Sequence, residues 1–229
     1  MRRIRVIFVL VLTSLLVCSG SSRLSRVTMA KGEIYVIRAG SSGPVLIKPG
    51  ELLQHGDTIR TGPASFAEVI VQNVGMFRVS ENSELKMEEL QQRNKTIIRL
   101  DKGKAGFFLL KQTQDQDTTV RLPTAVAGVR GTKFLASADG GSKVALFDGA
   151  VQVADPKNAT MILDKPGEVK LKQGESLEGR KPSPLSAESI ADMKALEQLF
   201  PINLEQVPRA IPEPEVRTPE GADLPQPGK

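Results

Sequence analysis

The sequence predicts an all-β protein made of many short strands, with one amphipathic helix near its C-terminus. Short apolar stretches recur along the chain, and Gly, Pro, Asn or Asp separates each stretch from the next, which is the pattern of strands joined by tight turns. The chain has eight phenylalanines, one tyrosine and no tryptophan, so its core must rest largely on aliphatic side chains, and the β-branched ones favour strands. With 40% hydrophobic residues among 229, the chain is long enough to bury one core.

Such closely spaced turns favour a compact β-solenoid or β-roll, in which each rung covers the apolar face of the one before it. A β-sandwich is the alternative, because it is also built from short strands and turns. A partial repeat supports the solenoid. Residues 165–168 (Lys-Pro-Gly-Glu) and the strand-like stretch after them are similar to residues 48–51 and the short apolar pair that follows.

The N-terminus has the pattern of an export signal. Three arginines among the first five residues precede an apolar run that ends at Val17. A bilayer-spanning helix needs about 20 apolar residues, so this shorter run predicts a secretory signal peptide over residues 1–19, with an uncleaved anchor as the alternative. The only cysteine, Cys18, ends the run in a setting that resembles a bacterial lipobox and is a candidate for lipidation. Because Val17 departs from the small residue usual before that cysteine, ordinary cleavage after Ser19 or Gly20 stays open.

Removal of the signal peptide changes the charge of the chain. The formal net charge is +5, and loss of three of the 31 basic residues leaves about +2 against the 26 acidic ones. We therefore do not expect nucleic acid as a partner. Residues 20–31 are small and polar with scattered arginines, which predicts a tether between the export signal and the folded part.

A β domain is expected over residues 32–180. Residues 66–71 are mostly apolar, as in a strand covered on nearly both faces, and residues 112–117 contain no apolar side chain and predict an exposed loop. The expected strands lie at residues 33–38, 45–48, 51–53, 58–61, 66–71, 76–79, 84–87, 95–100, 105–110, 119–122, 132–137, 143–147, 150–153 and 169–172.

A helix is predicted over residues 186–200, with Ser186 as its N-cap. We expect the helix to pack over an open end of the β domain, and a partner-binding helix is the alternative. Residues 201–229 contain seven of the 15 prolines and no aromatic residue, which predicts an extended, disordered tail. The apolar face of the helix comprises Ile190, Met193, Leu196, Leu199 and Phe200.

The most informative stretch is residues 122–153, where small and β-branched side chains surround one arginine. Its glycines leave room for close approach of neighbouring backbone. Two glycine turns, at residues 139–141 and 148–149, divide its second half into three short strands. The residues that define the stretch are Thr124, Ala127, Gly128, Val129, Arg130, Gly131, Thr132, Phe134, Asp148 and Gly149.

Arg130 has two interpretations. Because it lies between Gly128 and Gly131 within a strand-like run, we expect it to be buried, with its guanidinium donating hydrogen bonds to backbone carbonyls of neighbouring strands. The alternative is a surface arginine that binds the carboxylate of a partner.

Thr124, Ala127, the run Val129-Arg-Gly-Thr132 and Phe134 closely resemble the signature of the FecR domain family. The likeness extends back to residues 56–61 and 65–69 and so covers about residues 30–155. The resemblance implies a non-enzymatic module that faces the periplasm or the cell surface. Founding members of that family are inner-membrane regulators of sigma factors, with a cytoplasmic helical segment ahead of one membrane span.

We therefore expect an exported protein of the bacterial cell envelope, either periplasmic or a lipoprotein of the outer membrane or cell surface. Its expected role is that of a non-catalytic protein-interaction, scaffold or sensory module, with an unidentified envelope protein or cell-wall component as partner. The membrane is expected to be contacted only through a lipid on Cys18. A carbohydrate- or peptidoglycan-binding module is the alternative, although few aromatic residues are available to stack on sugars. A transmembrane anti-sigma regulator is less favoured, because only about five residues precede the apolar run.

No catalytic, metal or cofactor site is expected. His55 precedes Gly56 in a tight turn, and turn polarity explains it without chemistry. Asp115 and Asp117 have the spacing of loop carboxylates but lack the glycine and the later glutamate of a calcium loop. The glycines around Arg130 lead from strand to strand, so they do not form a phosphate-binding loop at a helix N-terminus.

Overall fold

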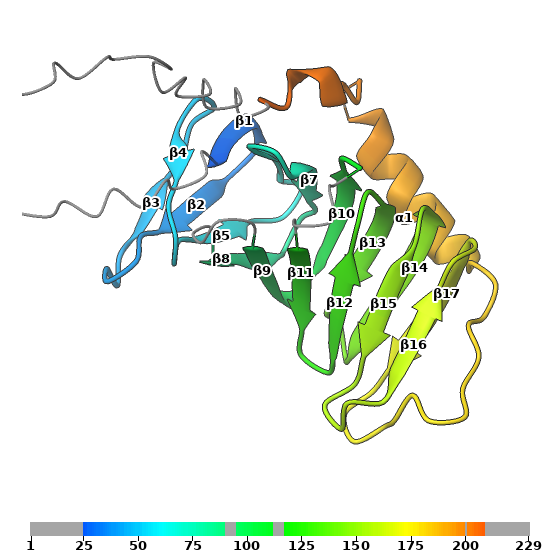
Figure 1. Ribbon diagram of the computed structural model, residues 1–229. Helices are drawn as coiled ribbons and strands as arrows, with labels where there is room; N and C mark the ends of the chain where they lie inside the picture. The colour runs from blue at the N-terminus through cyan, green and yellow to red at the C-terminus, as the bar shows by residue number, and fades with distance from the viewer. Residues whose placement is uncertain (1–24, 90–94, 112–116, 200, 209–229) are drawn as a thin grey trace, which may run out of the picture.

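The computed structural model describes residues 25–89, 95–111, 117–199 and 201–208. Within these ranges the chain forms two open β-sheets with a common core, and helix α1 (Ala187–Gln198) lies across the outer face of one of them (Figure 1). The all-β prediction and the α-helix near the C-terminus are confirmed.

The sheets contain eight and nine strands and are called sheet A and sheet B. In spatial order sheet A consists of β17 (Gly167–Leu171), β14 (Ser142–Asp148), β13 (Lys133–Ser137), β10 (Lys104–Leu109), β7 (Gly75–Val79), β6 (Phe66–Val71), β1 (Ser25–Lys31) and β4 (Leu52–Leu53). Sheet B consists of β16 (Thr160–Leu163), β15 (Val151–Ala154), β12 (Ala125–Val129), β11 (Asp117–Leu122), β9 (Lys95–Lys102), β8 (Glu84–Glu89), β5 (Thr58–Thr61), β2 (Ile34–Ile37) and β3 (Pro44–Leu46).

The chain fills both sheets stepwise from one end to the other. Strands β6 and β7 in sheet A are followed by β8 and β9 in sheet B, then by β10 in sheet A and by β11 and β12 in sheet B. Strands β9 and β11 pair in parallel, whereas β8 and β9 form an antiparallel pair. The two layers have the arrangement of a β-sandwich, which was the alternative to the predicted solenoid or roll.

The main core lies between the sheets, where the inward residues of alternating strands meet. Phe77, Phe107 and Phe134 lie opposite one another on β7, β10 and β13. The Phe107 and Phe134 rings are stacked with centroids 4.7 Å apart, and the Phe77 and Phe107 centroids are 5.8 Å apart. Such aromatic pairs stabilise a protein by roughly 0.5–1.5 kcal/mol beyond the contribution of their buried area. The three rings therefore stabilise the pairing of β7, β10 and β13 in the middle of sheet A.

The predicted repeat occurs in the structure, but its second copy lies at residues 172–175 and not at residues 165–168. In the turn at residues 48–51, Lys48 N donates to Glu51 Oε1 at 2.9 Å and Gly50 has a φ of 96°. The same geometry recurs at residues 172–175, where Lys172 N donates to Glu175 Oε2 at 2.9 Å. Residues 165–168 do not form this turn, because their glutamate pairs with Ala145 of β14 inside sheet A.

Two predicted boundaries are wrong. The tether over residues 20–31 is a strand from residue 25 onward, because the fully buried Val27 pairs with Val69 in sheet A. The predicted disordered tail is ordered over residues 201–208, where Val207 is buried and Asn73 N donates to the Pro208 carbonyl at 3.0 Å. Residues 1–24, with the predicted signal peptide and Cys18, and residues 209–229 lie outside the described ranges.

Candidate functional site

Thr124 joins the two sheets at the start of the signature stretch. It lies in the turn between β11 and β12 of sheet B and is buried. Its hydroxyl donates to the Leu171 carbonyl of β17 at 2.8 Å and lies 2.7 Å from Ser142 Oγ of β14. Its backbone N donates to the same Ser142 oxygen. A threonine at this point therefore fastens sheet B to the last strands of sheet A.

The apolar signature residues belong to the core. Ala127, Val129 and Phe134 point into the space between the sheets and are at most 2% exposed. Gly128 lies on the other face of β12, opposite Gln152 of β15. Thr132 is buried, and its carbonyl accepts a hydrogen bond from Leu109 N at 2.9 Å.

Two of the three signature glycines, Gly131 and Gly149, are required by crowding of the backbone, whereas a Cβ on Gly128 would meet nothing nearer than the Gln152 carbonyl oxygen at 3.9 Å. Gly131 has a φ of 62°, and a Cβ there would lie 2.6 Å from Lys111 Cα. Gly149 follows the exposed Asp148, has a φ of 90°, and would place a Cβ 2.8 Å from the Gly131 carbonyl oxygen. A side chain at either position would have to displace backbone atoms as well as adopt a strained φ.

Arg130 is exposed, and no hydrogen bond or ion pair joins its side chain to the described residues. The prediction that it is buried is wrong. Alternation along β12 points Val129 inward, so the next side chain points to solvent just before the left-handed turn at Gly131. Arg130 therefore does not hold the strands together.

A second set of residues forms a seat for α1 on sheet A. Opposing residues on successive strands make one row across the outer face, which we call the helix cradle: Glu168, Ala145, Leu135, Gly106, Arg78 and Glu68. Helix α1 lies over this row, with the first turn at Glu168 and the last turn at Arg78.

The N-terminal end of α1 meets a carboxylate. Glu168 Oε2 accepts hydrogen bonds from Ser186 N at 3.1 Å, from Ser186 Oγ at 2.9 Å and from Ser189 Oγ at 2.6 Å. Burial alone would raise the pKa of Glu168, but the hydrogen bonds from Ser189 and Ser186 outweigh burial and lower it. The anion stabilises the positive end of the helix dipole.

The C-terminal end of α1 meets a cation. Arg78 is 1% exposed and donates to the carbonyls of Leu196 at 2.6 Å and Glu197 at 3.2 Å. The same guanidinium forms an ion pair with Glu68 at 2.8 Å, and Thr28 Oγ1 donates to the other Glu68 oxygen at 2.7 Å. The buried charges are therefore paired, and the last helical carbonyls have donors.

The middle of the cradle is small and apolar. A Cβ on Gly106 would lie 3.0 Å from Leu196 Cδ1 and 3.6 Å from Met193 Sδ, so glycine lets the helix approach the sheet closely. Met193 and Leu196 are buried there as predicted, whereas Ile190 is 48% exposed, which corrects its assignment to the buried face. Phe200 lies outside the described ranges. The second apolar cluster contains Ile70, Met76, Phe108, Leu135, Ala145, Met193, Leu196 and Val207.

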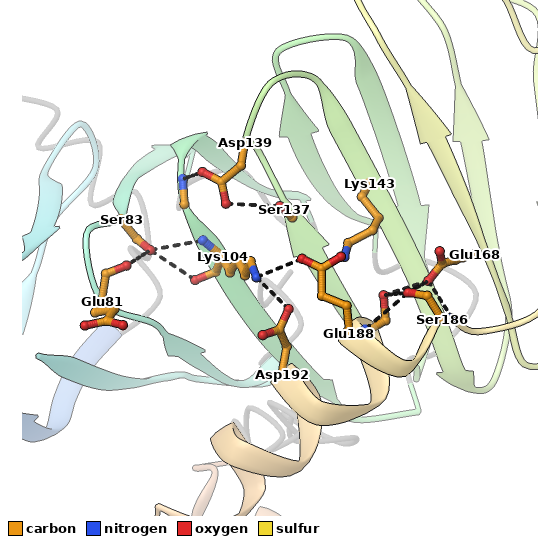
Figure 2. A network of polar contacts seen from close by, with 12 residues as sticks. Glu81, Ser83, Lys104, Ser137, Asp139, Lys143, Glu168, Ser186, Glu188 and Asp192 are labelled. Atoms are coloured by element: carbon orange, nitrogen blue, oxygen red, sulfur yellow. Dashed lines mark hydrogen bonds and ion pairs between the residues drawn. The ribbon is translucent and has the colours of Figure 1, made fainter. Parts of the chain in front are cut away.

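Beside the first turn of α1, a cavity of about 280 Å³ opens on sheet A, and we call it the lysine pocket. Lys104 Nζ lies 3.2 Å from Glu188 Oε1 and 2.7 Å from Asp192 Oδ2. Lys143 Nζ lies 3.1 Å from Glu188 Oε2, so one carboxylate bridges two lysines (Figure 2). The pocket is lined by Lys104, Ser137, Asp139, Gly140, Gly141, Ser142, Lys143, Lys170, Leu171, Lys172 and Glu188.

The outer face of sheet B carries no described helix (Figure 1), and we call it the open face. Lys86, Arg99 and Arg121 lie opposite one another on β8, β9 and β11, with Val126 of β12 next in the row. Arg99 pairs with Asp101 at 2.7 Å and Arg121 with Glu88 at 3.0 Å. A cavity of about 290 Å³ lies there, lined by Glu88, Arg99, Asp101, Arg121, Leu122, Pro123 and Val126.

Comparison with known families matches the FecR protein family over residues 57–152. This chain therefore contains a FecR domain. The comparison with curated proteins found no match.

Two solved structures are similar to the FecR-domain chain, and both are described as a candidate anti-sigma factor from Parabacteroides distasonis ATCC 8503. The first, at 1.65 Å resolution, is 16% identical, with 56% of this chain and 60% of that chain covered and a TM-score of 0.48. The second, at 2.50 Å, is 17% identical, with 66% and 61% covered and a TM-score of 0.37. The chain thus spans about 60% of the length of these structures.

The FecR match begins at Asp57, just before β5, and ends within β15. It includes Arg78, Gly106 and Lys143 but not Glu168 or α1, so the helix cradle joins the FecR domain to the segment that follows it. Sequence reasoning missed the cradle. The available signal was a charged residue inside each of two apolar strands, Glu68 in β6 and Arg78 in β7, because a buried charge needs a partner.

Two of the three residues considered for catalysis or metal binding lie in the parts of the chain that the structure describes. No group of three or more His, Cys, Asp or Glu residues there is placed to hold a metal ion. His55 is exposed in its turn, Asp117 is exposed at the start of β11, and Asp115 lies outside the described ranges. No described helix is long and apolar enough to cross a membrane.

Proposed function

We propose that this FecR-domain protein is an exported, non-catalytic binding module of the bacterial cell envelope that serves as a scaffold or sensory component. The signal-like N-terminus and the family support export. The observation that carries the binding role is the open face of sheet B, because the outer face of sheet A is already occupied by α1.

The charges of the open face favour a ligand-binding role over a merely solvated surface. Three cations lie opposite one another on adjacent strands, and like charges in that arrangement destabilise a sheet. Lys86 has no ion-pair partner among the described residues. Each guanidinium has five N–H donors, and the ion pairs of Arg99 and Arg121 leave most of these donors available to a partner.

Site-specific photocrosslinking in the native host tests the proposal. A photoreactive amino acid at Val126, which is 38% exposed on the open face, should capture a discrete envelope protein or cell-wall fragment. The same label at Lys194, exposed on α1, is the control. Equal capture at both positions, or none at Val126, would refute the role of the open face.

Fractionation of the same cells tests export. The chain should be found in the envelope or periplasmic fraction without residues 1–17, and Cys18→Ser should abolish fatty-acid labelling if the cysteine is the anchor. A cytosolic chain that retains its N-terminal residues would contradict export. A mature chain that begins after Cys18 would contradict lipidation.

A further inference from the structure

The lysine pocket contains an unusual row of like charges. Lys170 on β17, Lys143 on β14, Ser137 on β13 and Lys104 on β10 lie opposite one another across sheet A. Directly opposed cations destabilise a sheet, and Lys143 is in addition only 8% exposed. A buried ammonium is costly unless an anion accompanies it.

The walls of the pocket come from a turn and a strand end. The turn between β13 and β14 contains Gly140 and Gly141 with φ values of 68° and 143°, and these residues place no side chain over the lysines. Lys172 lines the other side, just after β17. The cavity of about 280 Å³ is therefore reached from the surface beside α1.

Glu188 shows which chemistry the pocket accommodates. Its two carboxylate oxygens accept from two different lysines at 3.1 Å and 3.2 Å, although 57% of its side chain is exposed. Hydrogen bonds from Lys143 and Lys104 lower the pKa of Glu188. The carboxylate thus acts as a resident ligand that the chain itself supplies.

The carboxylate of Glu188 does not occupy all the ammonium N–H donors of the lysine pocket. Lys172 has no ion pair with any described residue, and Lys170 has a single one, with Glu168 at 3.3 Å. Each ammonium has three N–H donors. A carboxylate-rich ligand could therefore place one carboxylate on Lys170 and Lys172 and a second one on Lys143 and Lys104, in place of Glu188.

We propose that the lysine pocket binds a carboxylate-rich segment of a partner protein, with Glu188 as an internal competitor for Lys143 and Lys104. This inference rests on the proposed role as a binding module and names the chemistry of one partner. Displacement of Glu188 would not undock α1. Glu168 would still accept hydrogen bonds from Ser186 and Ser189, and Arg78 would still donate to the Leu196 carbonyl in the last turn.

Binding of a fluorescent six-residue polyglutamate peptide to the purified mature chain tests the proposal by anisotropy at low salt. Lys172→Gln should weaken binding about threefold to fivefold, as expected for loss of one exposed ion pair. Glu188→Gln should strengthen binding by a similar factor, because it removes the competitor. Lys48→Gln, at an exposed lysine in the turn before β4, is the matched control and should change binding by less than about twofold.

The opposite signs of the two pocket variants separate this site from general attraction to basic surface. Weaker or unchanged binding in Glu188→Gln would overturn the proposal, as would equal losses in Lys172→Gln and Lys48→Gln. Tighter binding of tripolyphosphate than of the peptide would overturn the carboxylate assignment. Failure of the peptide to bind would refute the pocket alone, because crosslinking at Val126 tests the envelope function separately.

Discussion

At Gly131 the backbone has a φ of 62°, and a Cβ would lie 2.6 Å from Lys111 Cα. Its neighbour Arg130 is exposed and has no hydrogen-bond partner among the described residues. The two adjacent signature positions therefore differ sharply in what they contribute to folding.

We predict that Gly131→Ala lowers the free energy of unfolding by about 1–3 kcal/mol, because alanine is strained at positive φ and collides with backbone. Arg130→Ala should stay within about 0.5 kcal/mol of wild type, as is usual for an exposed side chain. Urea denaturation of both variants measures the difference. A large loss in Arg130→Ala would restore the structural interpretation of that arginine.

The side chain of Asp155 joins its own turn to the segment that follows β17. It accepts hydrogen bonds from Lys157 N and Ala159 N within its own turn, and from Ser176 Oγ and Leu177 N in the segment after β17. The hydrogen bond from Ser176 and that from Leu177 N, the two largest causes, lower the pKa of Asp155 to about 2.

Because the folded pKa lies below the usual 3.8, the contribution of Asp155 to stability is fully present above pH 3.8 and is lost as the pH falls toward 2. We predict that Asp155→Asn lowers the Tm by several degrees at pH 7, since the amide cannot accept all four hydrogen bonds. The difference from wild type should shrink between pH 4 and pH 2 in thermal melts. A Tm difference that is constant with pH would contradict a role for the ionised carboxylate.

At the scale of elements, α1 is held by charged residues at its two ends as well as by apolar contacts in its middle. Met193 and Leu196 are buried in its middle, while Glu168 and Arg78 accompany the two ends of its dipole. The buried Arg78 contributes to helix docking because it pairs with Glu68 and also donates to the last helical carbonyls.

We predict that Arg78→Met destabilises the protein by about 3–5 kcal/mol, because it leaves Glu68 buried without its partner. Hydrogen exchange should also accelerate in the last turn of α1, whose carbonyls lose their donors. Lys133→Met is the control, since it removes a more exposed ion pair with Glu197 and should cost about 1 kcal/mol or less. Equal effects of the two variants would show that Arg78 has no special role.

At the scale of the whole molecule, the two outer faces differ in polarity. The face of sheet A under α1 presents Ile70, Met76, Phe108 and Leu135, whereas the open face of sheet B is charged. An apolar patch of this kind tends to associate when it is uncovered.

We predict that a chain truncated after Ser183 keeps its β-sheet signal in circular dichroism but binds a hydrophobic dye and self-associates. Light scattering after gel filtration measures the association. The full mature chain, in which α1 covers the patch, is the control. A truncated chain that stays monomeric and binds no dye would mean that α1 is not needed to cover sheet A.

Local pattern determined the parts of this protein that depend on near neighbours in sequence. Alternation and turn residues predicted most of the strands and the all-β class, and the Ser186 cap and apolar spacing predicted α1. The close backbone approach expected at Gly131 is confirmed, whereas that expected at Gly128 is not. The motif also led to the FecR family.

Tertiary structure alone decided which charged residues meet. Glu68, Arg78, Lys143 and Glu168 lie on different strands, and their alignment in rows depends on strand order and register, which no local pattern encodes. Arg130 points outward for the same reason, because the inward face of β12 is set by its packing against sheet A. The sequence by itself therefore determined the elements, and the pairing of distant strands determined the cradle, the lysine pocket and the open face.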